Sequence, residues 1–315
     1  MNERVAQNHP RVRQVSVSAE EAGQRIDNFL ARYLKGVPRS HIYRILRRGE
    51  VRVNSGRIKA RYKVCAGDTV RIPPVRVSTG QAVSGQVRGG LAQHVLFEDD
   101  RCMVINKPAG LAVHGGSGLS LGLIEALRAE RPAAHYLELA HRLDRETSGC
   151  LVIAKRRSFL RAFHEQLRAG AVEKYYLALV AGNWAGGELT VDAPLRKNTL
   201  QGGERVVRVD ADGKAAVSLF RPVDRFNGAT LVEVDLKTGR THQIRVHAAH
   251  IGHPLAGDVK YGDAAFNADM RKRGLRRMFL HAHRVVFNDP AGKMVDVSAP
   301  LDDKLKAVLD QLELT

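Results

Sequence analysis

Two short helical patterns lie near the start of the chain. Between residues 16 and 35, apolar residues recur at intervals of three and four, which places them on one side of a helix. A glycine and a proline end this helix, and Ser40 can cap a second helix that runs to Gly49. Short alternating segments follow. We therefore predict a module of two helices and a small sheet over residues 16–73.

The rest of the chain predicts more strands than helices. Apolar segments bounded by turn residues predict strands at 102–106, 150–154, 174–180, 215–220 and 231–236. Helical spacing predicts helices at 121–131, 158–169 and 241–251. The polar, basic stretch 267–277 is expected to form a loop over a bound ligand. Because several strands are joined by short turns, we expect an α+β fold with a mixed, largely antiparallel central sheet.

A linker separates these two parts. Residues 75–90 hold four glycines and two serines and show no helical periodicity, which is typical of a flexible connection. We therefore divide the chain into an N-terminal arm, a first module, a linker and a second domain, at residues 1–15, 16–75, 76–90 and 91–315.

Charge points to a polyanionic partner. The formal net charge is +17, and residues 1–75 carry sixteen Lys or Arg against six Asp or Glu. Such a cationic module attracts nucleic acid, because each phosphate contact releases a counterion. A solvated basic face is the plainer alternative. An anionic membrane would need a basic amphipathic helix with aromatic anchors, and the single tryptophan, Trp184, lies far along the chain. We expect nucleic acid and no membrane.

Composition also bears on location. The longest apolar runs fall far short of the ~20 residues that span a bilayer, and the N-terminus has no apolar leader segment. The three cysteines have no CxxC spacing, which fits a reducing compartment. We expect a cytoplasmic protein. No heptad pattern indicates an interface, so a monomer is expected.

One segment is rich in side chains that are able to carry out chemistry. The sequence HRLDRETSG, residues 141–149, places Asp144 between Arg142 and Arg145, directly before an apolar strand. Flanking arginines favour the ionised carboxylate, which can act as a nucleophile or as a base. A surface ion-pair loop would show the same spacing, so the pattern alone leaves both readings open.

Two further segments are rich in polar residues. In TGRTHQIRVH, Thr241 can cap a helix whose first turns carry His242 and Arg245 on one face. In NKPAGLAVHGG a strand enters a glycine-rich turn, but the GK[ST] ending of a P-loop is missing. Six histidines lie between residues 242 and 283 without an HExxH pattern or a cysteine pair, so we expect no metal site. No dinucleotide fingerprint is present.

Taken together, these motifs resemble a known enzyme family. HRLDRETSG resembles the catalytic motif of the RluA family of pseudouridine synthases, and NKPAGLAVH and TGRTHQIRVHAAHIGHPLAGDVKYG resemble its two other signatures. GQRIDNFL and SHIYRILRRGEVRVNSGRIK, within residues 16–75, resemble an S4 RNA-binding domain. The resemblance covers residues 16–300 and implies the pseudouridine synthase fold behind a small S4-like module. It implies isomerisation of specific uridines in 23S rRNA, free or in a large-subunit assembly intermediate, without cofactor or metal.

The resemblance also implies roles for individual residues. Asp144 matches the catalytic aspartate, Arg245 its arginine partner, and Tyr176 the active-site tyrosine, although Tyr175 lies one position away. Leu280 matches a residue that lines the uracil pocket, and Arg142 one that fills the gap left by a flipped base. The signatures predict further substrate contacts from Lys107, His114, Arg240 and His242. In the S4-like module, RNA contacts are expected from Arg25, Arg39, Arg44, Arg47, Arg48 and Arg52.

The chemistry and the class of protein have alternatives. The carboxylate can attack the ribose or the base, or assist an elimination that leaves a glycal, and the residues do not choose among these routes. A non-enzymatic rRNA-binding or assembly factor would share the charge and the S4-like module. It would have no need for Asp144, Tyr176 and Arg245 to converge on one cleft.

Overall fold

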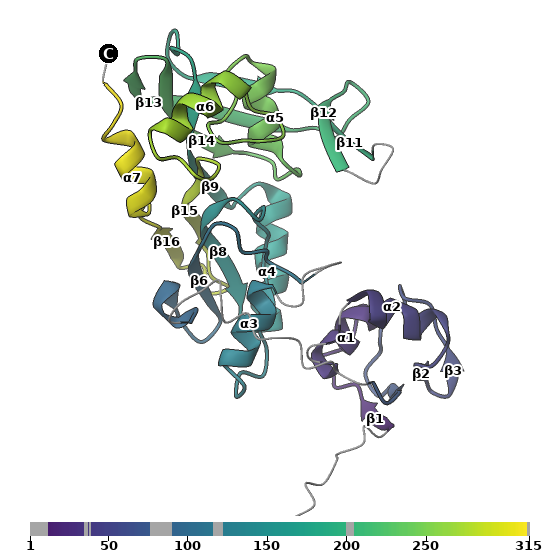
Figure 1. Cartoon of the computed structure of the whole chain (residues 1–315). Coiled ribbons are helices and arrows are strands. Elements are labelled where there is room, and N and C mark those ends of the chain that lie inside the picture. Colours follow the sequence, from purple (N-terminus) through teal and green to yellow (C-terminus); the bar gives the residue numbers. More distant parts are fainter. Residues whose placement is uncertain are drawn as a thin grey trace, which may run out of the picture. The chain divides into compact units, whose positions relative to one another are not determined.

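The fold is that of a computed structural model, which describes residues 12–34, 37, 39–75, 90–115, 122–199 and 205–313. The chain forms two compact units (Figure 1). The first contains residues 1–90 and 114–131, and the second contains residues 91–113 and 132–315. The second unit begins at the end of the predicted linker, of which residues 76–89 lie outside the described part. The predicted helix at 121–131 belongs to the first unit.

The first unit holds a four-stranded sheet with the order β1-β4-β2-β3. Its elements are β1 (Arg13–Ser16), α1 (Ile26–Tyr33), α2 (Arg39–Arg47), β2 (Arg52–Val53), β3 (Gly56–Arg57), β4 (Thr69–Ile72) and α3 (Leu123–Glu130). The apolar positions that predicted α1 and α2, among them Phe29 and Ile45, form its core together with Val51 and Val70. Both helices were predicted, but α2 begins at Arg39, so Ser40 lies within the helix and is not its cap.

The second unit is organised around a ten-stranded sheet. Its main path runs β10-β13-β14-β9-β15-β8-β6-β5, with β16 on β15 and β7 on β8. Only the β15–β8 pair is parallel, so the prediction of a mixed, largely antiparallel sheet is confirmed. The strands are β5 (Val95–Glu98), β6 (Cys102–Lys107), β7 (Glu138–Leu139), β8 (Ser148–Ala154), β9 (Glu173–Ala181), β10 (Leu189–Asp192), β13 (Val217–Phe226), β14 (Ala229–Leu236), β15 (Leu280–Asn288) and β16 (Met294–Ser298).

Helices and a separate hairpin complete the second unit. They are η1 (Ala92–His94), α4 (Arg157–Ala169), β11 (Leu195–Thr199), β12 (Arg205–Val209), α5 (Gln243–His250), α6 (Ala264–Lys272) and α7 (Asp303–Leu309). Helix α4 packs Phe159 and Phe163 against β8 and β15. Helix α5 lies beside the β11–β12 hairpin (Figure 1), where Val246 packs against Leu195 and Val207.

The predicted loop at 267–277 is wrong for its first half. Helix α6 runs to Lys272, with Asp263 capping its N-terminus by accepting a hydrogen bond from the Phe266 amide. Met270 and Leu275 are buried in the apolar cluster that also holds Phe279. Helix α6 thus packs against this cluster through Met270 and Phe266, two apolar side chains in an otherwise polar segment.

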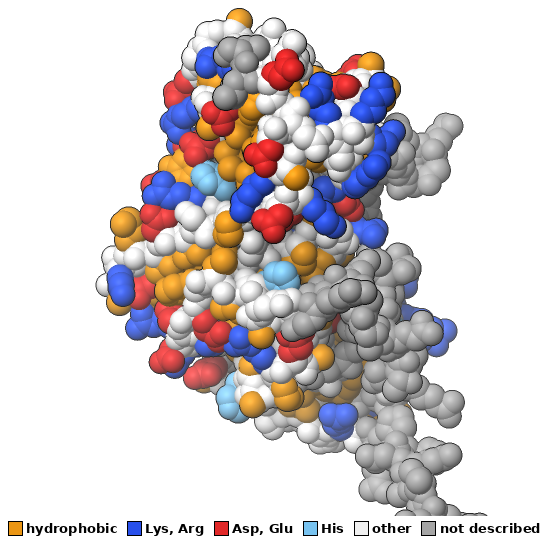
Figure 2. Space-filling view, turned by 60° about the vertical axis from the view of Figure 1, so that its left-hand side comes forward, with side chains coloured by type: hydrophobic (Ala, Val, Ile, Leu, Met, Phe, Trp, Pro, Cys, Tyr) orange, Lys and Arg blue, Asp and Glu red, His pale blue; other side chains and the backbone are white. Residues whose placement is uncertain are grey.

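Charges of both signs are mixed on the face shown in Figure 2, where Lys and Arg alternate with Asp and Glu. The excess of positive charge is therefore not gathered in one patch on that face. Among the described residues, no helix is long and apolar enough to cross a membrane.

Candidate active site

Asp144 lies on a loop that is fastened to neighbouring backbone on both sides. The carbonyl of Arg145 accepts hydrogen bonds from the Gly110 amide at 2.9 Å and from the Lys107 ammonium at 3.0 Å. His141 Nε2 accepts from the Val152 amide on β8 at 3.0 Å. Strand β8 is buried over its whole length, which anchors the loop that precedes it. The carboxylate is thus held at a defined place while about a fifth of its side chain stays exposed.

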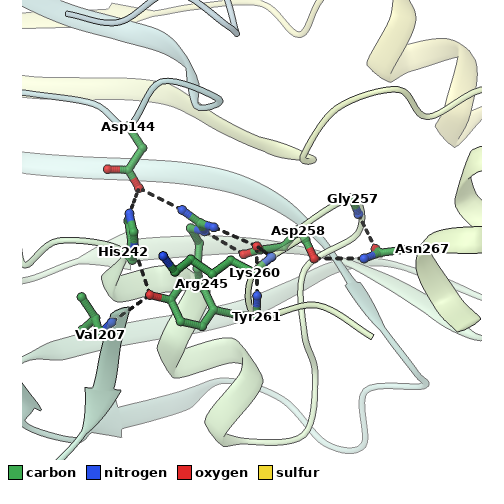
Figure 3. Close-up of polar contacts among 9 residues, drawn as sticks. All are labelled: Asp144, Val207, His242, Arg245, Gly257, Asp258, Lys260, Tyr261 and Asn267. Carbon is green, nitrogen blue, oxygen red and sulfur yellow. Dashed lines mark hydrogen bonds and ion pairs between the residues drawn. The ribbon is translucent and has the colours of Figure 1, made fainter. Parts of the chain in front are cut away.

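The turn before α5 is held by Gln243. Its side-chain oxygen accepts from the Thr238 hydroxyl and from the Arg240 amide, and its Nε2 donates to Ser218 Oγ. Thr241 was predicted to cap this helix, but the N-cap residue is His242, in the left-handed conformation with φ of 55°. Its ring makes no capping bond. Instead the ring turns toward Asp144, with Nε2 3.8 Å from Oδ2 (Figure 3).

Arg245 connects two carboxylates. Its Nε and Nη2 donate to Asp258 at 2.7 and 2.8 Å, and Nη1 lies 3.6 Å from Asp144 Oδ2 (Figure 3). Burial disfavours the charge on Arg245, but the hydrogen bonds and the charge of Asp258 outweigh it and raise the guanidinium pKa. Burial would likewise raise the pKa of Asp258, yet the paired arginine holds it below its usual value. Asp258 therefore fixes a permanently charged group in front of Asp144.

A pocket of about 220 Å³ opens beside Asp144. This volume suits a single base better than a drug-sized molecule. Of the predicted site residues, the pocket lining brings together Arg142, Asp144, Tyr176, Arg240, His242, Arg245 and Leu280. They come from the loop before β8, from β9, from α5 and from the start of β15, and β9, β15 and β8 are adjacent in the sheet.

The two candidate tyrosines occupy opposite faces of β9. Tyr176 is buried and lines the pocket, where burial and the Asp144 carboxylate raise its pKa. The Tyr175 hydroxyl instead donates to Glu173 at 2.6 Å, outside the pocket. The structure thus places Tyr176 beside Asp144.

Lys107 and His114 are not among the pocket-lining residues. Lys107 is fully buried and donates to the carbonyls of Pro108, Leu111 and Arg145, and burial lowers its pKa to about 7. Lys107 was predicted to contact the substrate, and the structure contradicts this. Because its ammonium group is buried and fully hydrogen-bonded, it has no donor left for a ligand. His114 is an exposed residue of the first unit, and its predicted contact stays a prediction.

The arginines of the S4-like module have varied surroundings. Arg44, Arg47 and Arg48 are exposed at the end of α2. Arg25 donates to both oxygens of Asp27, and Arg52 donates to the Gly49 carbonyl. The Arg39 side chain lies outside the described part of the chain. The exposed arginines are the ones most available to an anionic ligand.

Three residues at the site received no role from the sequence. Asp258 holds Arg245, Tyr261 contacts His242, and His141 fastens the catalytic loop. All three lie inside the motifs already quoted, in GDVKYG and HRLDRETSG. The signal was present, but the partners lie 11 to 19 residues away along the chain and only the fold pairs them.

Comparison with known proteins agrees with this geometry. Residues 101–250 match the family model described as RNA pseudouridylate synthase, and residues 24–70 match the S4 domain. The protein named ribosomal large subunit pseudouridine synthase C from Yersinia pestis is 54% identical over 307 residues, covering 96% of both chains. Its namesake from Escherichia coli (strain K12) is 54% identical over 310 residues, covering 96% of this chain and 97% of the relative.

A solved structure supports the same assignment. Human RNA pseudouridylate synthase domain containing 4 superposes with a TM-score of 0.59 at 28% identity, covering 71% of this chain and 95% of the human one. None of these comparisons supports a non-enzymatic binding factor. The chain is an enzyme of the RNA pseudouridylate synthase family, on the branch of the ribosomal large subunit pseudouridine synthases C.

Proposed function

We propose that this enzyme converts specific uridines of 23S rRNA, free or within a large-subunit assembly intermediate, to pseudouridine. One observation carries the proposal: Asp144 faces Arg245 and His242 at the mouth of a base-sized pocket lined by Tyr176 and Leu280. The relatives named above supply the substrate class through their names. The reaction breaks the N1–C1′ bond and joins C5 to C1′, so the product is an isomer of the substrate.

Asp144 supplies the reactive carboxylate. Arg245 lies 3.6 Å from it and is held from behind by Asp258, so a positive charge stays beside the carboxylate when RNA excludes water. Attack on the ribose, attack on the base and an assisted elimination each need an ionised carboxylate at this position. The site geometry serves all three.

Tyr176 and Leu280 belong to the apolar part of the pocket lining. Burial raises the pKa of Tyr176, so its phenol stays protonated near neutral pH and its ring is suited to stacking on uracil. To remove the C5 proton, Tyr176 would have to act as a phenolate, and this form is scarce near neutral pH. Leu280, at the start of β15, closes the apolar side of the pocket.

A stacked uridine must leave its helix to reach this pocket. Extruding a base costs a few kcal/mol. Arg142 is exposed at the pocket edge and can occupy the vacated stack, while the exposed Arg240 can contact the flanking backbone and His242 lies beside Asp144. The S4-like module, at residues 16–75 of the proposed division, adds phosphate contacts through its exposed arginines. We further propose that the enzyme acts as a cytoplasmic monomer.

A pseudouridine map tests the substrate class. Unmodified large-subunit and small-subunit rRNA transcripts, and a large-subunit precursor particle, would be incubated with the enzyme without added metal or cofactor. Carbodiimide labelling and reverse transcription then locate pseudouridines. We expect stops at a few uridines of the large-subunit RNA only. Stops confined to small-subunit RNA, or none in any substrate, would overturn the proposal.

A further inference from the structure

Tyr261 connects the β11–β12 hairpin to the active-site histidine. Its hydroxyl oxygen lies 3.0 Å from the Val207 amide nitrogen and 2.8 Å from His242 Nδ1 (Figure 3). Val207 is a buried residue of β12, and Tyr261 packs against the same apolar cluster. The hydroxyl is therefore hydrogen-bonded to the hairpin through Val207 and to the active site through His242.

The directions of these hydrogen bonds follow from the donors. A backbone amide can only donate, so the Tyr261 oxygen accepts from Val207. The phenolic proton then needs an acceptor, and His242 Nδ1 is the one within hydrogen-bond distance that the described residues record. If Nδ1 carried a proton instead, the oxygen would accept twice and its own proton would have no recorded acceptor.

This arrangement determines the imidazole tautomer. A neutral ring whose Nδ1 accepts must carry its proton on Nε2. Nε2 is the atom directed at Asp144, 3.8 Å from Oδ2. The ring is neutral near pH 7, since burial lowers the pKa of His242, and the charges that face it are those of Asp144, Arg245, Lys260 and Asp258. The distance exceeds a hydrogen bond in the free enzyme, and such contacts commonly shorten when substrate binds.

The backbone of His242 supports the same role. A histidine with φ of 55° is uncommon, and such conformations cost about 1–3 kcal/mol and cluster at active sites. Here the left-handed conformation directs the ring toward Asp144 instead of capping α5. The Tyr261 ring also lies under the Arg245 guanidinium, at 5.0 Å. One tyrosine thus contacts both Arg245 and His242, the two residues that face the catalytic carboxylate.

We propose that Tyr261 is a positioning residue: its hydroxyl, placed by Val207, fixes His242 with the proton on Nε2 and directs that N–H at Asp144. This inference rests on the proposed isomerase function and deepens it. In this proposal the β11–β12 hairpin helps to position the active-site residue His242 through the Tyr261 hydroxyl.

The first test reads the tautomer directly. In the full-length protein labelled with ¹⁵N-histidine, two-bond proton–nitrogen correlations identify which ring nitrogen is protonated, and loss of one signal set in His242→Gln identifies the residue. We expect a protonated Nε2 in the wild type and a mixture of tautomers in Tyr261→Phe. A wild-type ring protonated on Nδ1 would overturn the proposal, whether or not the enzyme is active.

The second test uses kinetics. Tyr261→Phe keeps the ring beside His242 and Arg245 and removes only the hydroxyl. We expect kcat to fall about tenfold with KM nearly unchanged, because the reacting groups are misplaced and RNA contacts are kept. An unchanged kcat, or a loss confined to KM, would contradict the proposal. Tyr175→Phe, which removes a hydroxyl outside the pocket, is the matched control.

A double-mutant cycle distinguishes positioning of His242 by Tyr261 from a general structural effect of the Tyr261 substitution. The amide of His242→Gln can donate toward Asp144 without Tyr261, so this variant should keep more activity than His242→Ala. Adding Tyr261→Phe to His242→Gln should then cause no further loss, since the pair acts as one unit. Multiplying losses would overturn the proposal. If wild-type enzyme formed no pseudouridine at all, the proposed function would fail while the nitrogen spectrum still decided the tautomer.

Discussion

At the scale of single residues, the groups that face Asp144 are each held in place by a further residue. Arg245 is held by Asp258 before it reaches Asp144, and His242 is held by Tyr261. Preorganised groups of this kind need not reorient during the reaction, which is the main source of electrostatic stabilisation in enzymes. The arrangement holds a guanidinium and an imidazole at fixed positions beside the Asp144 carboxylate.

A substitution of Lys107 tests whether its ammonium group stabilises the loop that carries Asp144 or binds the substrate. Lys107→Met should lower the free energy of unfolding by about 3 kcal/mol, because three buried carbonyls lose their donor. Urea unfolding measures this loss, with exposed Lys293→Met as the control. A variant with normal stability and weakened RNA affinity would show instead that the ammonium reaches the RNA.

At the scale of elements, the site depends on the close approach of β8 and β15. Gly149 has φ of +107°, and a Cβ there would lie 2.2 Å from the Ala282 carbonyl oxygen. Only glycine permits this parallel pair, which sets the Asp144 loop beside Leu280. The apolar pattern of β8 predicted the strand but did not indicate that it pairs with β15.

Gly149→Ala should therefore lower the free energy of unfolding by about 3 kcal/mol. Gly170→Ala is the matched control, since Gly170 also has a positive φ of +72° but no atom within 4 Å of its added Cβ. That control should cost only about 1 kcal/mol. Equal thermal and urea stability of the two variants would show that the contact with Ala282 relaxes freely.

Long, periodic elements were predictable, and pairings were not. The strands at β6, β8, β9 and β14 and helix α4 follow from local apolar patterns, because these patterns persist over five or more residues. Strands β5, β7, β10, β11, β12 and β16 were missed, as were α6 and α7, because they are short or mostly polar. Strand β15 was missed because two histidines and an arginine interrupt its apolar pattern. The residues around Asp144 came from motif resemblance, whereas Asp258 and Tyr261 acquired roles only when the fold brought them to α5.

At the scale of the whole molecule, we expect the two units to divide RNA binding and the chemical step between them. The exposed arginines at the end of α2 lie in the first unit, and the complete pocket lies in the second. Mutations should therefore be able to change RNA affinity without changing the rate of the chemical step. The net charge of +17 predicts strong salt dependence of RNA binding.

Replacing Arg44 and Arg47 together by glutamine should weaken RNA binding and lower the salt slope, d log K/d log[salt], by about 1.5. Filter binding at several salt concentrations measures this, and kcat at saturating RNA should be unchanged. Lys293→Gln, which removes an exposed cation of the second unit, should leave the slope as it is. An unchanged slope in the double variant would show that α2 does not contact phosphate.

The most direct test of the central claim compares Asp144→Asn with the wild type. The substitution keeps the size and polarity of the side chain and removes its charge in front of Arg245. Pseudouridine formation on large-subunit rRNA would be measured under single-turnover conditions, with RNA affinity determined in parallel. We expect isomerisation to be abolished and affinity to remain within a few-fold. Full turnover by Asp144→Asn would contradict the account, because no ionised carboxylate would then be needed at this position.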